Sequence, residues 1–340
     1  MAYYRIARQP PAGEIERIGI LVVNLGTPSS PSYLAVWRYL REFLGDRRVI
    51  DAPRVIWFPI LYGFILTLRS LRTVRNYRKV WMTEGSPLAV LSKALTRKLA
   101  ARMESQFGDR VKVELAMTYG EPSVASMVAK MVDMNVKRLL VLPSYPQYCS
   151  STTGAVFDRV CQALKRWRWI PEMRFINDYY SNDAYVRAIA DSVREHWKKR
   201  GAASHLLLSF HGIPQEYVAQ GDPYKAQCES TTARVIEHLQ LAAQDFTLAY
   251  QSRFGPVLWL QPYTEDSLKA LAARGVREVT VVSPSFAVDC LETLEEIAVE
   301  YREAFARLGG KLTLVPALND GDLHVEVLTE VILNHLKGWV

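Results

Sequence analysis

The stretch Leu206-Leu-Leu-Ser-Phe-His-Gly-Ile-Pro214 decides the fold class of this chain. A continuous apolar run that stops at Gly and Pro is typical of a strand in a parallel sheet, covered on both faces. Ligands of open α/β sheets bind beyond the carboxyl ends of the strands. His211 lies at such an end and is therefore a candidate proton acceptor or metal ligand. The alternative is a histidine that caps the strand end and bonds only to backbone.

The rest of the chain repeats this alternation of apolar strands with periodic helical stretches. Such alternation indicates βαβ units and parallel sheets. The expected strands are residues 18–25, 111–119, 138–145, 173–177, 205–210, 247–251, 278–283 and 311–315. The expected helices include residues 32–44, 87–104, 123–134 and 323–336.

The amino-acid sequences of the two halves also resemble each other. Asn24-Leu-Gly-Thr-Pro28 matches Phe210-His-Gly-Ile-Pro214, and residues 135–145 match residues 275–286 with one residue of slip. We interpret the chain as two copies of one α/β domain. Where the first copy has Leu25 and Ser151, the second has His211 and Glu292. Both differences add a group that can take a proton or bind metal, so the C-terminal copy is the expected chemical half.

This repeat predicts the domain organisation. We expect two Rossmann-like domains, each a parallel sheet flanked by helices, at residues 1–170 and 171–322. Residues 323–340 should form a C-terminal helix that packs back on the N-terminal domain. A chain of 340 residues is comfortable for two domains.

The segment 284–297 leaves a strand and enters an acid-rich helix. Asp289 is a reasonable N-cap, and Glu292 three residues later would complete a capping box. Glu296 and Glu300 continue at i+4 and i+8, where like charges repel each other. One interpretation is a solvated acidic face; the other is a path for cations or protons that starts near His211.

Composition excludes several classes of function. The four cysteines form no Cys-x-x-Cys pair, so neither a disulfide framework nor a zinc knuckle is expected, and a reducing cytoplasm fits. Residues 1–17 lack the apolar core of a signal peptide. No glycine-rich phosphate loop and no Gly-x-Ser-x-Gly elbow follows a strand, which counts against nucleotide binding and esterase activity.

The net charge of +7 is concentrated between Arg38 and Lys79. This segment holds an apolar run at 55–68, interrupted by Pro59 and Gly63, and then arginines at every third position from Arg69 to Arg78. The run of fourteen residues is too short to span a bilayer. The apolar run 55–68 is here called the lip. Together with the arginines it favours a contact with a membrane surface or the mouth of a binding site for an anionic ligand. The alternative is a core helix with a solvated basic face, and nucleic acid is disfavoured. Trp57, Phe58 and Leu61 are the expected contact residues.

Several motifs together resemble the ferrochelatases. They are Ser209-Phe-His-Gly-Ile-Pro214, Gln251-Ser-Arg-Phe-Gly-Pro256, Trp259-Leu-Gln-Pro262, Asp289-Cys-Leu-Glu-Thr-Leu-Glu-Glu296, Tyr145-Pro-Gln-Tyr148, Ser151-Thr-Thr-Gly154 and Gly85-Ser-Pro-Leu88. The likeness covers residues 24–319 and is greatest to the cytoplasmic protoporphyrin enzymes of Gram-negative bacteria. It implies a lyase of haem biosynthesis that inserts Fe(II) into protoporphyrin IX, in a cleft between two Rossmann-like domains.

The resemblance also implies roles for particular residues. His211 and Glu292 match the active-site pair that handles protons and iron, and we favour His211 as the base. Glu296 and Glu300 match an acidic row on a partly π-helical element. Tyr119, Trp259 and Phe286 match residues that line the porphyrin pocket, and Arg78, Lys79 and Ser92 fall near the propionate-binding region.

Two departures from the family pattern bear on these roles. Thr118 stands where many members have Arg, and Cys290 where the animal type has His. Because Cys290 is the last cysteine, no 2Fe–2S cluster is expected, and Fe(II) is a substrate rather than a resident cofactor. The expected location is the cytoplasm, with peripheral contact at the inner membrane through residues 55–79.

The physical chemistry of metal insertion fits these residue types. An imidazole with a pKa near ~6.5 can accept a pyrrole proton at neutral pH. A carboxylate is an exchangeable ligand for a divalent cation. Two alternatives stay open: a coproporphyrin III ferrochelatase, whose substrate has four propionates, and a haem- or porphyrin-binding protein without catalysis, which would need no acidic row.

Overall fold

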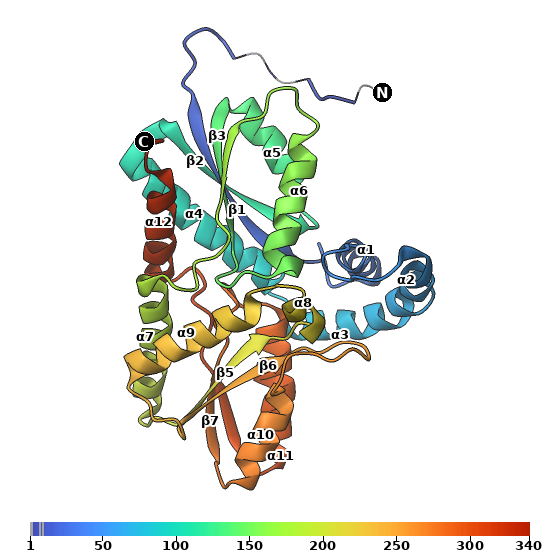
Figure 1. Ribbon diagram of the computed structural model, residues 1–340, viewed down its shortest axis with the longest axis vertical. Helices are drawn as coiled ribbons and strands as arrows, with labels where there is room; N and C mark the ends of the chain where they lie inside the picture. The colour runs from blue at the N-terminus through green and yellow to red at the C-terminus, as the bar shows by residue number, and fades with distance from the viewer. Residues whose placement is uncertain (1–2, 7, 9) are drawn as a thin grey trace. The chain divides into compact units, whose positions relative to one another are not determined.

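The computed structural model describes residues 3–6, 8 and 10–340, and these form two compact units. The first unit comprises the described residues up to Tyr145, then Ser150–Asp178 and Leu328–Val340. The second comprises Pro146–Cys149 and Tyr179–Val327. Each unit contains one four-stranded sheet (Figure 1). Helix α12 (Asp322–Leu336) begins in the second unit, and its residues from Leu328 onward belong to the first.

The first unit is built on strands β1 (Arg17–Gly26), β2 (Val111–Tyr119), β3 (Val136–Pro143) and β4 (Glu172–Phe175), in the order β2-β1-β3-β4. All neighbours are parallel. Helices α5 (Val124–Asp133) and α6 (Ala155–Leu164) pack on one face, where Leu21, Val128 and Val160 share a buried cluster. Helices α1 (Tyr33–Leu44) and α4 (Pro87–Phe107) also belong to this unit.

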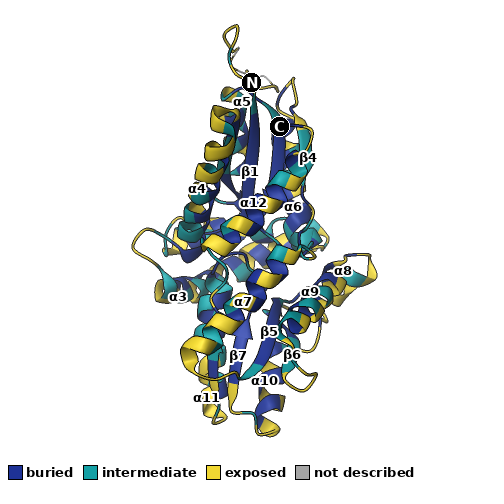
Figure 2. Ribbon diagram, turned by 90° about the vertical axis from the view of Figure 1, so that its left-hand side faces the viewer, coloured by how far each residue is buried: buried dark blue, intermediate teal, exposed yellow. Residues whose placement is uncertain are grey.

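The second unit repeats this arrangement. Strands β5 (His205–His211), β6 (Phe246–Gln251), β7 (Glu278–Val282) and β8 (Lys311–Leu314) pair in parallel in the order β6-β5-β7-β8. Strands β1, β5 and β7 are mostly buried (Figure 2), as expected for central strands covered on both faces. The helices are α7 (Asp183–Arg200), α8 (Gln215–Ala219), α9 (Tyr224–Leu239), α10 (Thr264–Ala273) and α11 (Arg302–Arg307).

The shared strand order confirms the predicted repeat and fold class. All eight predicted strands are present, and each end lies within two residues of the predicted one. A short π-helix follows the third strand of each sheet: η3 (Ser150–Gly154) in the first unit and η4 (Glu292–Tyr301) in the second. Ser151 and Glu292, aligned by the repeat, therefore occupy corresponding elements. The two copies thus share a wider helical turn at the same place in the domain.

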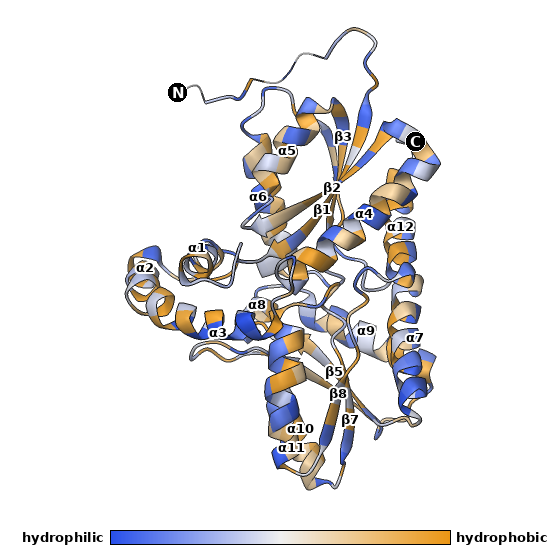
Figure 3. Cartoon of the chain, turned by 180° about the vertical axis from the view of Figure 1, so that it is seen from behind, coloured by the Kyte–Doolittle hydropathy of each residue, from blue (hydrophilic) through white to orange (hydrophobic). Residues whose placement is uncertain are grey.

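The lip and the arginine-rich segment after it form one helical arm (Figure 3). The arm consists of α2 (Arg54–Ile60), the π-helix η1 (Leu61–Arg69) and α3 (Ser70–Val80), which follow one another without a break. Pro59, which interrupts the apolar run in the sequence, lies inside α2 and does not end the arm. By length and composition alone, the segment Arg54–Val80 could cross a membrane. Only 22% of its most apolar window is buried, which disfavours the core-helix alternative.

Two of the three expected contact residues on this arm are buried, and the prediction was wrong for these two. Trp57 and Leu61 are buried, and the Trp57 indole donates a hydrogen bond of 2.8 Å to the Leu44 carbonyl. They anchor the arm to its own unit, and Phe58 is 41% exposed. Larger exposed fractions belong to Val55 (87%), Ile56 (62%), Phe64 (68%), Leu68 (69%) and Leu71 (53%).

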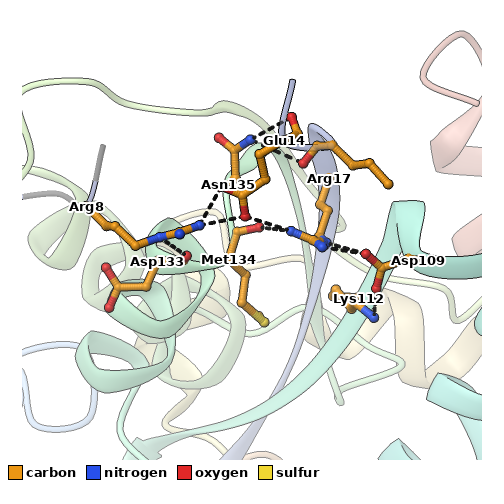
Figure 4. A network of polar contacts seen from close by, with 9 residues as sticks. Arg8, Glu14, Arg17, Asp109, Lys112, Asp133, Met134 and Asn135 are labelled. Carbon is orange, nitrogen blue, oxygen red and sulfur yellow. Dashed lines mark hydrogen bonds and ion pairs between the residues drawn. The ribbon is translucent and has the colours of Figure 1, made fainter. Parts of the chain in front are cut away.

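A polar network joins the amino ends of the first sheet's strands (Figure 4). Arg17, at the start of β1, donates to the Met134 carbonyl at 2.8 Å and pairs with Asp109. Asp109 also bonds Lys112 at 2.5 Å, and Asn135 Nδ2 donates to the Ile15 carbonyl at 3.1 Å. These residues lie at the end of the sheet opposite to where ligands bind in α/β folds, so the network stabilises the unit.

Candidate active site

His211 is the last residue of β5 and lies opposite Gln251 at the end of β6. Its Nδ1 lies 2.6 Å from the Gly212 carbonyl. A carbonyl can only accept, so Nδ1 carries the proton and Nε2 carries the lone pair. The backbone contact of the capping alternative is thus present, but it uses one ring nitrogen and prepares the other to accept a proton.

Gly212 permits a close approach of two strands beside the histidine. Its N–H donates to the Gln251 carbonyl at 2.7 Å. A Cβ at this position would lie 2.8 Å from the same oxygen and 3.3 Å from the Trp259 ring. The glycine of the His-Gly-Ile-Pro motif is therefore required by packing at the site.

Two aromatic rings neighbour the imidazole. The ring centroids of Trp259 and Phe286 lie 6.5 Å and 6.3 Å from that of His211. The Trp259 indole is fixed by a 2.8 Å bond to the Phe254 carbonyl, and both rings are only partly buried. The site thus offers flat apolar contact beside a proton acceptor.

The segment before η4 does not form the predicted capping box. The Asp289 carboxylate accepts from Thr293 Oγ1 at 2.8 Å, Asn319 Nδ2 at 2.8 Å and the Ala317 N–H at 3.3 Å. Thr293 Oγ1 also accepts from the Cys290 N–H at 3.1 Å. The helical segment starts without a side-chain cap, because Asp289 is committed to Asn319 and Thr293. The capping interpretation of Glu292 was therefore wrong.

Glu292 and Glu296 lie along one side of η4, where i→i+5 hydrogen bonds widen the turn. The Glu292 carbonyl receives a long 3.4 Å contact from Gln251 Nε2. Burial raises the pKa of Glu296, while hydrogen bonds from Ser252 and Tyr301 oppose that rise, as does the positive charge of His211 when its imidazole is protonated. Glu300, further along, is exposed.

Sequence reasoning missed several residues around this row. Tyr301 donates a 2.7 Å bond to Glu296 from five residues further on in the same π-helix. Glu295, on the other side of η4, is buried. Gln251 and Ser252 were quoted as part of a motif, but no periodicity in the sequence shows that they reach across to η4.

The remaining predicted residues belong to the first unit. Tyr119 is fully buried at the end of β2, with the Arg159 guanidinium 5.2 Å from its ring centroid, and burial raises the pKa of its hydroxyl. Ser92 is buried on α4 and accepts a 3.0 Å bond from Asn24. Arg78 and Lys79 are exposed at the end of α3.

Thr118, the residue before Tyr119, has a local partner. Its hydroxyl donates to the Asn24 carbonyl at 3.1 Å. It lines a cavity of about 240 Å³ together with Glu42 and Arg159. Among residues 3–6, 8 and 10–340, no group of three or more His, Cys, Asp or Glu side chains is arranged to hold a metal ion.

The repeated sheets and the histidine at a central strand end define a protein of the chelatase fold. Solved structures support this class: SirB from Bacillus subtilis with Fe³⁺ aligns over 94% of this chain and 95% of its own, with a TM-score of 0.53 and 9% identity. A cobalt complex of the sirohydrochlorin chelatase SirB from Bacillus subtilis subspecies spizizenii aligns with a TM-score of 0.51 and 9% identity, over 92% and 93% of the two chains.

Sequence comparison identifies the family. The ferrochelatase family model matches residues 17–336. The ferrochelatase of Thioalkalivibrio sulfidiphilus is 45% identical over 328 residues, which are 96% of this chain and 89% of that protein. The ferrochelatase of Teredinibacter turnerae is 44% identical over 324 residues, which are 95% of this chain and 88% of that protein. The chain belongs to the ferrochelatase family, and the resemblance seen in its motifs is confirmed.

Proposed function

We propose that this enzyme inserts Fe(II) into protoporphyrin IX to form protohaem, the terminal step of haem biosynthesis. The observation that carries the proposal is His211. It is an imidazole held by Nδ1 at a strand end, with two aromatic rings beside it and an acidic π-helix in the same unit. Family membership supplies the reaction class.

The reaction exchanges two pyrrole N–H protons for one Fe(II), so the site must accept protons and release a dehydrated cation. His211 Nε2 is the proposed acceptor, because its partner nitrogen is already committed as a donor. Glu292 is the proposed guide for iron, since a carboxylate binds a divalent cation and lets it go again. The two protons leave to solvent, and iron bonds the four ring nitrogens.

A planar macrocycle shields its nitrogen lone pairs, so bending it exposes them to the metal. Trp259 and Phe286 supply contact area beside His211. Holding a ligand in a distorted shape is a strain contribution of roughly 1–5 kcal/mol, supplied by binding elsewhere on the ring. Contacts of Tyr119, Arg78, Lys79 and Ser92 with the porphyrin are part of the proposal. Fe(II) is substrate in this scheme, and no iron–sulfur cluster is proposed.

The deciding experiment is anaerobic incubation with Fe(II) and protoporphyrin IX, followed by the absorption spectrum of haem. A parallel incubation with coproporphyrin III tests the runner-up, whose four propionates make a more soluble substrate. The exposed apolar arm at Arg54–Val80 favours the less soluble protoporphyrin. Binding of haem without any metal insertion would instead identify a carrier and overturn the proposal.

We also propose peripheral contact of a cytoplasmic enzyme with the inner membrane through residues 55–79. The support is an arm that exposes large apolar side chains and then the basic end of α3. Such a surface combines burial of apolar area with attraction to anionic lipid.

A further inference from the structure

We propose that Glu296 is a positioning residue that fixes His211 relative to Glu292, and that it is not a carrier of iron or protons. This inference rests on the function proposed above and assigns a role within the same site. It follows from how many donors the Glu296 carboxylate already serves.

Both oxygens of the Glu296 carboxylate are occupied. Oε1 accepts from the Ser252 N–H at 3.0 Å and from the Tyr301 hydroxyl at 2.7 Å. Oε2 accepts from the Ser252 hydroxyl in a short bond and from Gln251 Nε2 in a long contact of 3.5 Å. A carboxylate offers about four lone-pair sites in all. Iron or a proton could bind here only by displacing donors that are held by the fold.

The backbone at Ser252 shows that this contact is maintained against strain. Its φ is +65°, in the left-handed region that non-glycine residues rarely adopt. Such a conformation persists when the surrounding structure holds it. Here the residue directs both its N–H and its hydroxyl to the one carboxylate, which explains the conformation.

The residues that Glu296 holds are those that support the histidine. Gln251 accepts the Gly212 N–H through its carbonyl and the Ser209 hydroxyl, at 2.7 Å, through its side chain. Further along the chain, the Leu260 N–H donates to the carbonyl of Ile213, two residues after His211, at 2.9 Å. The segment 251–260 is thereby bonded to the residues on both sides of His211.

Glu296 therefore makes most of the hydrogen bonds that join this segment to η4; the other is the long contact from Gln251 Nε2 to the Glu292 carbonyl. Glu292 starts that π-helix and Tyr301 ends it, and Tyr301 supports the Glu296 carboxylate from the same element. Releasing Glu296 would let the end of β6 move relative to η4. The separation of the proton acceptor from the iron guide would then no longer be fixed, and reacting groups must be held closely in place for full rate.

The test compares Glu296→Gln with Glu296→Ala. Glutamine can accept from the Ser252 N–H and Tyr301 through Oε1, and its amide can donate to the Ser252 hydroxyl after that hydroxyl rotates. We expect Glu296→Gln to keep at least about a third of wild-type kcat, with an unchanged half-saturating Fe(II) concentration. We expect Glu296→Ala to lose at least about tenfold in kcat. A carrier role predicts that Gln is as damaging as Ala, or that it raises the Fe(II) requirement, and either result would overturn the inference.

A second measurement does not depend on activity. Amide hydrogen exchange in residues 247–260 should be faster in Glu296→Ala than in Glu296→Gln, because only Ala removes the contact. Tyr301→Phe should also lower kcat, but should add little in the Glu296→Ala background, since both changes act through one carboxylate. If the wild-type enzyme inserts no iron, the proposed function fails while the exchange comparison still decides whether Glu296 holds this segment. Equal exchange in all variants would contradict it.

Discussion

Asp289 and Asn319 hold each other by two hydrogen bonds of 2.8 Å. Asn319 Oδ1 accepts from the Asp289 N–H, and Asn319 Nδ2 donates to the Asp289 carboxylate. Asn319 has a φ of +51°, a conformation that Asn tolerates better than most residues. Asn319 thereby fixes the start of the segment that carries Glu292, just as Ser252 fixes its middle through Glu296. Glu292 itself is not needed to begin the helix.

This relationship makes Glu292→Gln a test of chemistry rather than of stability. We expect turnover to fall by at least roughly tenfold, a barrier rise of ~1.4 kcal/mol or more, because the change removes a negative ligand and a proton acceptor while preserving shape. The melting temperature should change little, since no side chain caps this helical start. Steady-state haem formation and thermal unfolding measure the two effects.

Glu303→Gln, on the exposed side of α11, is the matched control and should leave both measurements near wild type. A Glu292→Gln enzyme that melts earlier yet turns over normally would mean that the carboxylate has only a structural role.

His211→Ala should abolish most insertion while porphyrin still binds. Loss of a general base costs about 10²–10⁴-fold in rate. Turnover at saturating Fe(II) and quenching of porphyrin fluorescence on binding separate chemistry from affinity. More than a tenth of wild-type turnover in this variant would show that another group takes the protons.

The same strand offers a matched control for that variant. His205 lies at the other end of β5, where its Nε2 bonds Thr247 Oγ1 at 2.9 Å. His205→Asn changes the same residue type in the same strand and should keep turnover within about threefold, because the site is at the carboxyl end.

The sequence was informative where apolar runs and repeats carry the signal. Parallel strands buried on both faces read as continuous apolar runs, and so the strands and their repeat could be predicted. His211 was found because it lies at the end of an apolar strand, and because the second copy of the repeat places it where the first has Leu25. The helical period also placed Glu292 and Glu296 on one element.

What the sequence could not show depends on contacts between distant segments. The role of Asp289 changed from cap to partner of Asn319, a residue thirty positions away. Ser252 and Tyr301 reach Glu296 through a left-handed turn and a π-helical turn, and neither has a sequence period of its own. On the arm, the apolar character of a residue does not by itself show that Trp57 is buried and Phe64 is exposed.

The arm leads to a prediction about membranes. Replacing Val55, Ile56, Phe64 and Leu68 with Ser should lower binding to anionic liposomes at least about tenfold, since each buried apolar side chain contributes about 1.5–3 kcal/mol when fully transferred. Turnover of detergent-dispersed porphyrin should stay near wild type. Sedimentation with liposomes at low salt, and its decrease at high salt, gives the measurement.

Trp169 and Ile170 provide the control for this prediction. They are large apolar side chains that are 50% and 54% exposed, and they belong to the same unit but not to the arm. Serine at both positions should leave liposome binding unchanged. Equal losses in the two variants would assign the binding to general surface hydrophobicity.

The last prediction concerns pH and His324, which lies on α12 and is 1% exposed. Its Nδ1 donates to the Asn319 carbonyl at 2.6 Å, and burial lowers the pKa of the imidazole to about 4. Its pKa in the unfolded chain is near ~6.5. As the pH falls, the unfolded chain binds the proton at a higher pH than the folded protein does. The stability that the neutral His324 contributes is therefore fully present above pH ~6.5 and is lost as the pH falls toward about 4. The full loss is about 3 kcal/mol, at 1.36 kcal/mol per pKa unit.

Thermal unfolding between pH 7.5 and 4.5 tests this linkage in the wild type and in His324→Gln. Glutamine retains a donor for the Asn319 carbonyl but does not titrate, so its melting temperature should fall less steeply below pH 6.5. Carboxylates that titrate in the same range are common to both proteins, and therefore the difference between the two slopes isolates His324. The absolute melting temperature of the variant is not the measure, because a longer side chain in a buried position costs stability at every pH. Parallel slopes would show that His324 is protonated in the folded enzyme or that this part of α12 opens before the pH reaches its pKa.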